Sequence, residues 1–142
     1  MALIISPAYG YKHTHFQAIV NKRYIVRGDV RHCSSSVVVD PYVKIWMVYD
    51  GKKVEKKKTI IHQKTLNPVF NETFTFAVPY ERIRHTSLVI SVMDHDRLGR
   101  NDKIGQLVLG TKSGAMEVKH WNEMFAKSRT PVQKWHMLKD FD

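Results

Sequence analysis

The sequence is poor in cysteine and has no long apolar run. Cys33 is the single cysteine, which excludes an internal disulfide and a zinc site built from several thiolates. So little cysteine fits a reducing compartment. The chain also lacks the ~20-residue apolar stretch of a membrane-spanning helix, and the apolar run within residues 1–7 is too short for a secretory signal. We therefore expect a soluble protein, or one that visits a membrane surface.

Acidic residues are scarce relative to basic ones. Thirteen Asp and Glu against 23 Lys and Arg give a formal charge of +10 and a sequence pI near 9.8. This balance favours an anionic partner, which can be nucleic acid, an acidic membrane surface or an acidic protein. The length of 142 residues and the 43% hydrophobic content suit one globular domain with a real core.

Three of the few carboxylates gather in one short stretch. Residues 87–93 alternate between apolar and polar as a half-buried strand does, and Asp94 and Asp96 follow at its end. Two residues apart in an extended chain, they point the same way, and a glycine and an asparagine then let the chain turn back towards Asp102. Hard carboxylate oxygens suit Ca2+, which neutralises their repulsion. The alternative is a solvated acidic turn, the usual meaning of an isolated Asp-x-Asp.

A dense basic run forms the second chemical feature. Residues 52–64 contain six lysines and one glutamate, a local charge of +5. In a strand, Lys56 and Lys58 share one face and Lys57 takes the other, so one face remains for an anion site. Two interpretations stay open with equal weight: an anionic-lipid contact worth ~1 kcal/mol per lysine, or a lysine-protected edge strand.

The remaining pattern predicts an all-β fold. Asp50 and Gly51 are a strong signal for a two-residue hairpin turn. Alternating segments predict short strands at regular spacing, and helical spacing of apolar residues within 114–126 predicts one short amphipathic helix near the C-terminus. Together these favour an antiparallel β-sandwich, in which loops cluster at the two ends. The predicted strands cover residues 43–49, 52–60, 73–79, 87–93, 104–109 and 131–138.

Residues 1–37 read differently from the rest. Residues 16–20 and 23–26 are predicted to form a hairpin, and residues 27–36 a loop. His13, His15 and His32 with Cys33 fit no standard zinc spacing, so we interpret these histidines as surface residues.

Several motifs in register resemble one family. Residues 40–139 resemble the second C2 domain of the synaptotagmins in the order and spacing of their motifs, and the His120-Trp121 and Trp135-His136 pairs resemble synaptotagmins rather than other C2 domains. The resemblance predicts a C2 domain over residues 38–142 and an atypical segment over residues 1–37. The motifs are Asp40 to Ile45, Lys56 to Thr59, Thr65 to Pro68, Phe70 to Glu72, Val92 to Asp96, Asn101-Asp102 and Ile104-Gly105.

The resemblance implies an eight-stranded sandwich that binds Ca2+ through two loops at one tip. Arg129 matches the first of two family arginines at the opposite end, and Thr130 replaces the second. The matching Ca2+ ligands are the carboxylates of Asp40, Asp94, Asp96 and Asp102 and the main-chain carbonyl of His95, and the matching basic strand, which contacts phosphoinositides, SNARE membrane-fusion proteins and adaptor proteins in the family, is Lys56, Lys57 and Lys58.

Two departures from the family pattern lie upstream. Ser34 stands where the family has a further aspartate, which leaves the Ca2+ site one ligand short and predicts weaker affinity or fewer ions. Residues 1–37 also lack, on sequence pattern, the two family strands that precede the first loop. We expect these strands to be missing or replaced.

The first functional expectation is a Ca2+-regulated phospholipid-binding module of vesicle trafficking and exocytosis, peripheral on the cytoplasmic side of a vesicle or plasma membrane. The alternative is a Ca2+-insensitive adaptor that binds acidic proteins or phosphoinositides through the basic strand. Nucleic acid is not expected, because the aromatic residues take core positions rather than a stacking platform. An enzyme is not expected either, since His95, the one candidate base beside the aspartates, should alternate away from them.

Overall fold

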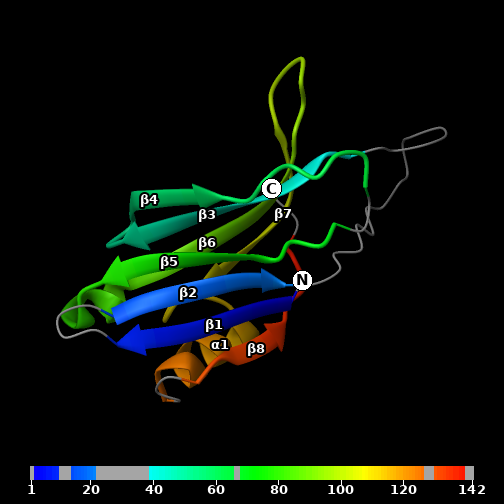
Figure 1. The fold of residues 1–142 in the computed structure, drawn as a ribbon. Helices are drawn as coiled ribbons and strands as arrows, with labels where there is room; N and C mark the ends of the chain where they lie inside the picture. Colours follow the sequence, from blue (N-terminus) through cyan, green and yellow to red (C-terminus); the bar gives the residue numbers. More distant parts are fainter. Residues whose placement is uncertain (1, 10–13, 22–38, 66–67, 127–129, 140–142) are drawn as a thin grey trace.

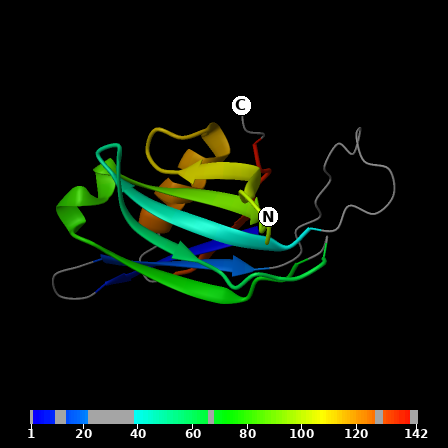
Figure 2. The same cartoon turned by 90° about the horizontal axis from the view of Figure 1, so that it is seen from above.

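The computed structural model describes residues 2–9, 14–21, 39–65, 68–126 and 130–139. Two four-stranded antiparallel sheets face one another, with strand orders β5-β2-β1-β8 (the β1 sheet) and β4-β3-β6-β7 (the β3 sheet) (Figures 1 and 2). The predicted antiparallel β-sandwich is confirmed. Its elements are β1 (Ala2–Tyr9), β2 (Thr14–Asn21), β3 (Pro41–Tyr49), β4 (Lys52–Lys58), β5 (Glu72–Val78), the 3-10 helix η1 (Tyr80–His85), β6 (Thr86–Asp94), β7 (Asp102–Leu109), α1 (Ala115–Ala126) and β8 (Val132–Trp135).

The β3 sheet follows the sequence pattern closely. β3 and β4 are joined by the predicted two-residue turn, in which Asp50 and Gly51 have φ of 47° and 77°. Positive φ at both positions gives the turn the twist of the strands it connects, and aspartate and glycine adopt it at low cost. β3 pairs in turn with β6 along its whole length, so the ends of these two strands coincide.

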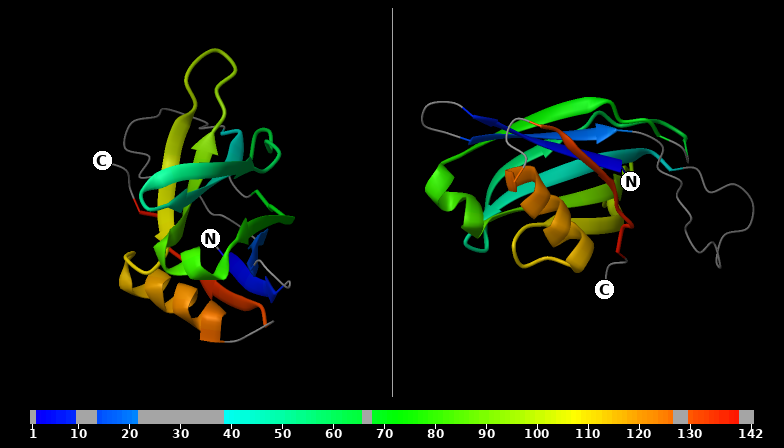
Figure 3. Two further views of the ribbon diagram at one scale, coloured as in Figure 1. Left: turned by 90° about the vertical axis from the view of Figure 1, so that its left-hand side faces the viewer. Right: turned by 90° about the horizontal axis from the view of Figure 1, so that it is seen from below.

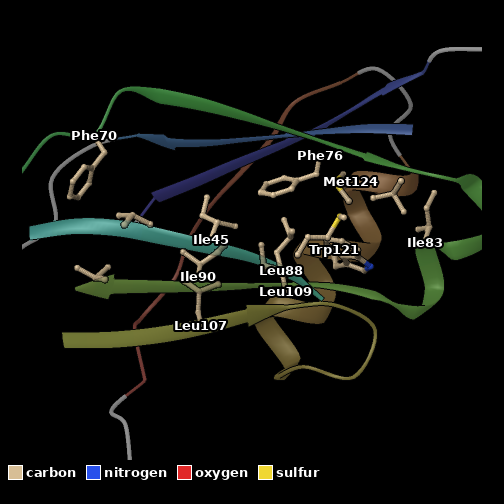
Figure 4. Close-up of a cluster of buried hydrophobic side chains, with 14 residues drawn as sticks. Ile45, Phe70, Phe76, Ile83, Leu88, Ile90, Leu107, Leu109, Trp121 and Met124 are labelled. Carbon is tan, nitrogen blue, oxygen red and sulfur yellow. The ribbon is translucent and has the colours of Figure 1, made fainter. Parts of the chain in front are cut away.

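The core lies between the two sheets. Val43, Ile45 and Met47 alternate inward from β3, and β6 and β7 contribute further apolar side chains on the same face. Figure 4 shows this layer meeting Phe76 of β5 and Trp121 of α1, both fully buried. Each such side chain stabilises the fold by about 1.5–3 kcal/mol relative to leaving it exposed.

Helix α1 closes one margin of the sandwich. It contacts β1, β7 and β8, and Figure 3 shows it running beside β8. Trp121 and Met124 are buried on the side that faces the sheets, as the helical spacing predicted. Among the described residues, neither α1 nor η1 has the length and apolar character that a membrane-spanning helix needs.

The first two strands, which we expected to be missing or replaced, are present and lie within residues 1–37. β1 and β2 pair with each other, and they join β8 and β5 respectively, which completes the β1 sheet. β2 therefore pairs with β1, whereas residues 23–26, its predicted hairpin partner, lie outside the described residues. β8 pairs with β1 only from Ala2 to Ile5, so Pro7, which has no N–H to donate, lies beyond that ladder. The division of the chain at residue 38 stays a prediction.

Candidate functional site

Four aspartates lie at or just beyond one end of the β3 sheet, and we call them the acidic tip: Asp40, Asp94, Asp96 and Asp102. Asp40 directly precedes β3, Asp94 ends β6 and Asp102 begins β7. Pro41 is opposite Asp94, and Asp94 is opposite Asp102 in the strand register. Because β3, β6 and β7 are neighbours, the structure brings together the two acidic segments that are far apart in the sequence.

Backbone hydrogen bonds fix the carboxylates of the acidic tip. The Asp40 N–H donates to Asp94 Oδ1 at 2.8 Å, and the Lys64 N–H donates to Asp40 Oδ1 at 2.7 Å. The His95 N–H donates to the Asp40 carbonyl at 2.9 Å, which ties the start of the β6–β7 loop to the entry of β3. Such charge-assisted bonds hold the side chains in place while leaving second oxygens for other partners.

The β6–β7 loop projects from the end of the sheet and is held by hydrogen bonds of its own (Figure 1). Asp96 Oδ1 accepts the Leu98 N–H at 2.8 Å, and Asn101 Oδ1 accepts the Asp96 N–H at 3.0 Å. Asn101 also donates from Nδ2 to the Tyr42 hydroxyl at 2.9 Å, and the His95 ring meets Tyr42 edge-on. This network presents Leu98 at the end of the loop with 98% of its surface exposed.

A second charged surface covers the outer side of the β3 sheet, and we call it the basic face: Lys44, Lys53, Lys56 and Lys58. Lys56 is opposite Trp46 and Lys58 is opposite Lys44 in the β3–β4 register. The ammonium groups of Lys53 and Lys56 lie 5.2 and 5.4 Å from the centroid of the Trp46 ring. Opposite residues of an antiparallel pair share a face, so these side chains form one surface.

The lysines of the basic face are partly desolvated and repel one another. Burial lowers the pKa of Lys44, and the nearby charges of Lys53 and Lys56 lower it further. The pKa of Lys103 on β7 is lowered in the same way, first by burial and then by Lys44 and Lys53. A bound anion relieves this repulsion, so an anion and the charged lysines stabilise one another.

Comparison with known proteins decides the family. The family profile described as "C2 domain" matches residues 25–124, which is more than half of the chain. The chain belongs to the C2 domain family. The match spans the acidic tip, the basic face and most of α1, so both surfaces belong to the C2 domain itself.

Two groups of relatives extend this result. The C2 domain is 55% identical over 100 residues to Synaptotagmin-7 of Mus musculus and 46% identical to Synaptotagmin-2 of Homo sapiens, in each case over 70% of this chain. It spans only 25% and 24% of those two proteins. The crystal structure of the RIM C2A domain from Drosophila covers 97% of each chain with a TM-score of 0.65 at 17% identity, which supports the fold alone.

The donor chemistry of the acidic tip fits Ca2+ better than a softer metal. All its side-chain donors are carboxylate oxygens, which hard cations prefer. Among the described residues, however, no three His, Cys, Asp or Glu side chains are close enough to hold a metal ion as they stand. Asp40, Asp94 and Asp96 each use one carboxylate oxygen to accept a backbone N–H. A bound ion would therefore be coordinated by their second oxygens and by the main-chain carbonyls of His95 and its neighbours.

The structure gives Lys57 a different role from Lys56 and Lys58. As predicted, it lies on the opposite face of β4, and its ammonium donates to the Thr75 carbonyl of β5 and pairs with Glu55 at 3.4 Å. The ammonium also lies 5.1 Å from the centroid of the Phe76 ring. Lys57 therefore connects the edges of the two sheets, and we leave it out of the basic face.

We expect Lys57→Met to destabilise the C2 domain without weakening any anion binding. The methionine keeps the apolar stem but loses the charged hydrogen bond, which costs about 1–2 kcal/mol. Urea unfolding measures the loss, with Lys52→Met, an exposed lysine of the same strand, as the control. Equal stability of the two variants contradicts the bridging role.

Two predicted residues lie outside the described part of the chain, and two residues of the site were not predicted. Arg129 and Ser34 lie outside the described residues, and Thr130 is exposed. Sequence reasoning missed Lys44 as a member of the basic face, although its outward position in an alternating strand was the available signal. It also missed Tyr42, whose hydroxyl anchors the β6–β7 loop and for which strand alternation gives no signal.

Two surface pockets lie away from both charged surfaces. One of about 450 Å3 lies against the β3–β4 turn, at the opposite end of β3 from the acidic tip, and one of about 550 Å3 lies between η1 and α1. They share Arg84 and Thr111. The Thr111 hydroxyl donates to the Arg84 carbonyl at 3.1 Å, so its hydrogen is committed to the fold.

Proposed function

We propose that this C2 domain is a Ca2+-regulated module that binds anionic phospholipid and acts in vesicle trafficking and exocytosis. The observation that carries the proposal is that Asp40, Asp94 and Asp102 lie at the same end of three adjacent strands, with the basic face on the same sheet. It is a binding module rather than an enzyme.

The acidic tip is the part of the domain that responds to Ca2+. Without a cation the acidic tip repels anionic lipid. When Ca2+ is bound it supplies the positive charge that attracts lipid phosphate, and the carboxylates of Asp40, Asp94, Asp96 and Asp102 with the His95 carbonyl would hold it. Leu98 then meets the acyl boundary of the bilayer, because nothing in the fold covers its side chain.

The basic face adds an attraction that needs no Ca2+. Lys56 and Lys58 are exposed, and polyanionic headgroups such as phosphoinositides suit a cluster of lysines around an aromatic ring. The same surface suits SNARE and adaptor proteins that carry acidic segments. The expected location is the cytoplasmic side of a vesicle or plasma membrane, held peripherally. The proposal has three further parts. The domain takes the second C2 position within a synaptotagmin, and Arg129 contacts a partner. Ser34, in place of an aspartate, weakens the affinity for Ca2+.

Co-sedimentation with phosphatidylcholine–phosphatidylserine vesicles, with and without Ca2+, tests the proposal. We expect stronger binding with Ca2+ and weaker, salt-sensitive binding without it. Binding that never responds to Ca2+ favours the alternative, a Ca2+-insensitive adaptor that uses the basic face alone.

The Ca2+-independent component is expected to depend on the basic face. We expect Lys56→Ala/Lys58→Ala to reduce it about thirtyfold, since each lysine contributes ~1 kcal/mol at an anionic surface and every 1.4 kcal/mol is about tenfold. Lys112→Ala/Lys119→Ala removes two exposed lysines elsewhere and controls for net charge. Equal losses in the two variants mean that net charge, and not this face, sets the attraction.

A further inference from the structure

Two adjacent isoleucines are exposed in the connection between β4 and β5. Ile60 has 66% of its surface exposed and Ile61 has 39%, and we call them the apolar pair. Exposed isoleucine is common singly, but two in succession form a small apolar patch. The acidic tip and the basic face do not include it.

Hydrogen bonds to β3 hold the chain on both sides of the apolar pair. Before it, the Thr59 N–H donates to the Val43 carbonyl at 2.9 Å, and the Thr59 hydroxyl accepts the Val43 N–H at 2.9 Å. After it, the His62 N–H donates to the Pro41 carbonyl at 3.0 Å. The exposure of the pair is therefore fixed by β3, a central strand that pairs with β4 on one side and β6 on the other.

The returning arm of the same connection adds a third apolar side chain. The His62 and Phe70 rings meet edge-on with centroids 4.9 Å apart, and Phe70 is buried. This contact brings the two arms together directly after Ile61 on one arm and directly after Val69 on the other. Val69 has 49% of its surface exposed.

The apolar pair lies along the chain between the two charged surfaces. Exposure alternates through β4 and beyond it, with Lys56, Lys58 and Ile60 outward. On the far side of the pair, the Lys64 N–H donates to the Asp40 carboxylate of the acidic tip. An apolar patch flanked by exposed lysines complements an anionic bilayer, in which hydrocarbon lies beneath negative headgroups.

We propose that the apolar pair enters the headgroup–acyl boundary of an anionic bilayer and joins the basic face and the acidic tip into one continuous membrane contact. This rests on the proposed function. The domain then lies obliquely on the membrane, with the β4 edge and the tip down together. The Ile60 N–H donates to the Glu72 carboxylate at 3.1 Å, so insertion leaves this donor satisfied.

A fluorescence experiment tests the position of the pair. Ile61→Cys in a Cys33→Ser background carries an environment-sensitive NBD label, and the probe is phosphatidylcholine–phosphatidylserine vesicles (about 3:1) with Ca2+. We expect a blue shift on binding and quenching by nitroxides on the acyl chains. The same label at Thr111→Cys, an exposed residue of the opposite end, is expected to stay aqueous.

A pair of matched variants tests the energetic contribution. We expect Ile60→Ser/Ile61→Ser to weaken vesicle binding about tenfold through lost apolar burial, and Met116→Ser/Met137→Ser, which alters two exposed apolar residues away from β4, to change it less than about twofold. If the unmodified domain binds vesicles but the label at residue 61 stays in water, this inference alone is overturned. The same holds if the unmodified domain binds and the two double variants bind with equal affinity. No vesicle binding by the unmodified domain overturns the proposed function and the inference with it. Unchanged urea unfolding of each variant excludes a folding defect.

Discussion

Asp94→Asn/Asp96→Asn is expected to abolish the Ca2+-dependent part of vesicle binding and to leave the Ca2+-independent part intact. Asparagine keeps the size of each side chain and one carbonyl oxygen, so the bonds that Asp94 accepts from Asp40 and that Asp96 accepts from Leu98 survive. The negative charge that attracts a hard cation is lost. We expect the ratio of binding with and without Ca2+ to fall from about tenfold or more to near unity.

The matched control for this variant lies at the other end of the sandwich. Asp50→Asn makes the same chemical change at a turn position with φ of 47°, which asparagine also tolerates. We expect it to leave the response to Ca2+ unchanged. A persistent response in Asp94→Asn/Asp96→Asn, measured by co-sedimentation and by isothermal titration with CaCl2 alone, rules out the acidic tip as the Ca2+ site.

Strand alternation explains why so much of the β3 sheet was predictable. Asp50 and Gly51 fixed one hairpin, and the opposite faces taken by Lys56 and Lys57 follow directly from the twofold repeat of a strand. These are local properties, so the sequence carries them without knowledge of the partner strands.

The features that sequence reasoning missed depend on which strands become neighbours. β1 and β2 complete their sheet by pairing with β8 and β5, which come much later in the chain. Lys44 and Lys103 join the lysines of β4 only because β3 and β7 lie in the same sheet. The bridge from Lys57 to β5 likewise requires the packing of the two sheets, which no local pattern reveals.

The sandwich also contains a buried pair of histidines that links α1 to β8. His120 Nε2 donates to the Val132 carbonyl at 2.7 Å, since a carbonyl only accepts. His120 Nδ1 is then the acceptor for the His136 Nε2–H at 2.7 Å. Both rings are at least 95% buried, so the pair depends on neutral imidazoles. Protonating His120 points two N–H groups at one another and removes the bond between the rings.

The charged groups around this pair act in both directions: some favour protonation of the histidines and others disfavour it. Burial lowers the pKa of both histidines, and for His136 the value falls to about 4, with His120 as the next cause. Glu117 favours protonated His136, but it is paired with Lys139 at 3.3 Å. Lys134, itself paired with Glu123 at 3.1 Å, disfavours protonation of both rings.

We therefore expect the C2 domain to lose stability as the pH falls from 6.5 to about 4. In that window the unfolded chain binds a proton at His136 and the folded chain does not, so the loss from this residue reaches about 3 kcal/mol at the acid end. Urea unfolding across the window measures it. His136→Gln should be less stable than the natural domain at pH 7.5 yet show a flatter decline, whereas His85→Gln removes an exposed imidazole and controls for net charge. An equally steep decline in His136→Gln assigns the acid sensitivity to other groups, because the titrating ring is then gone.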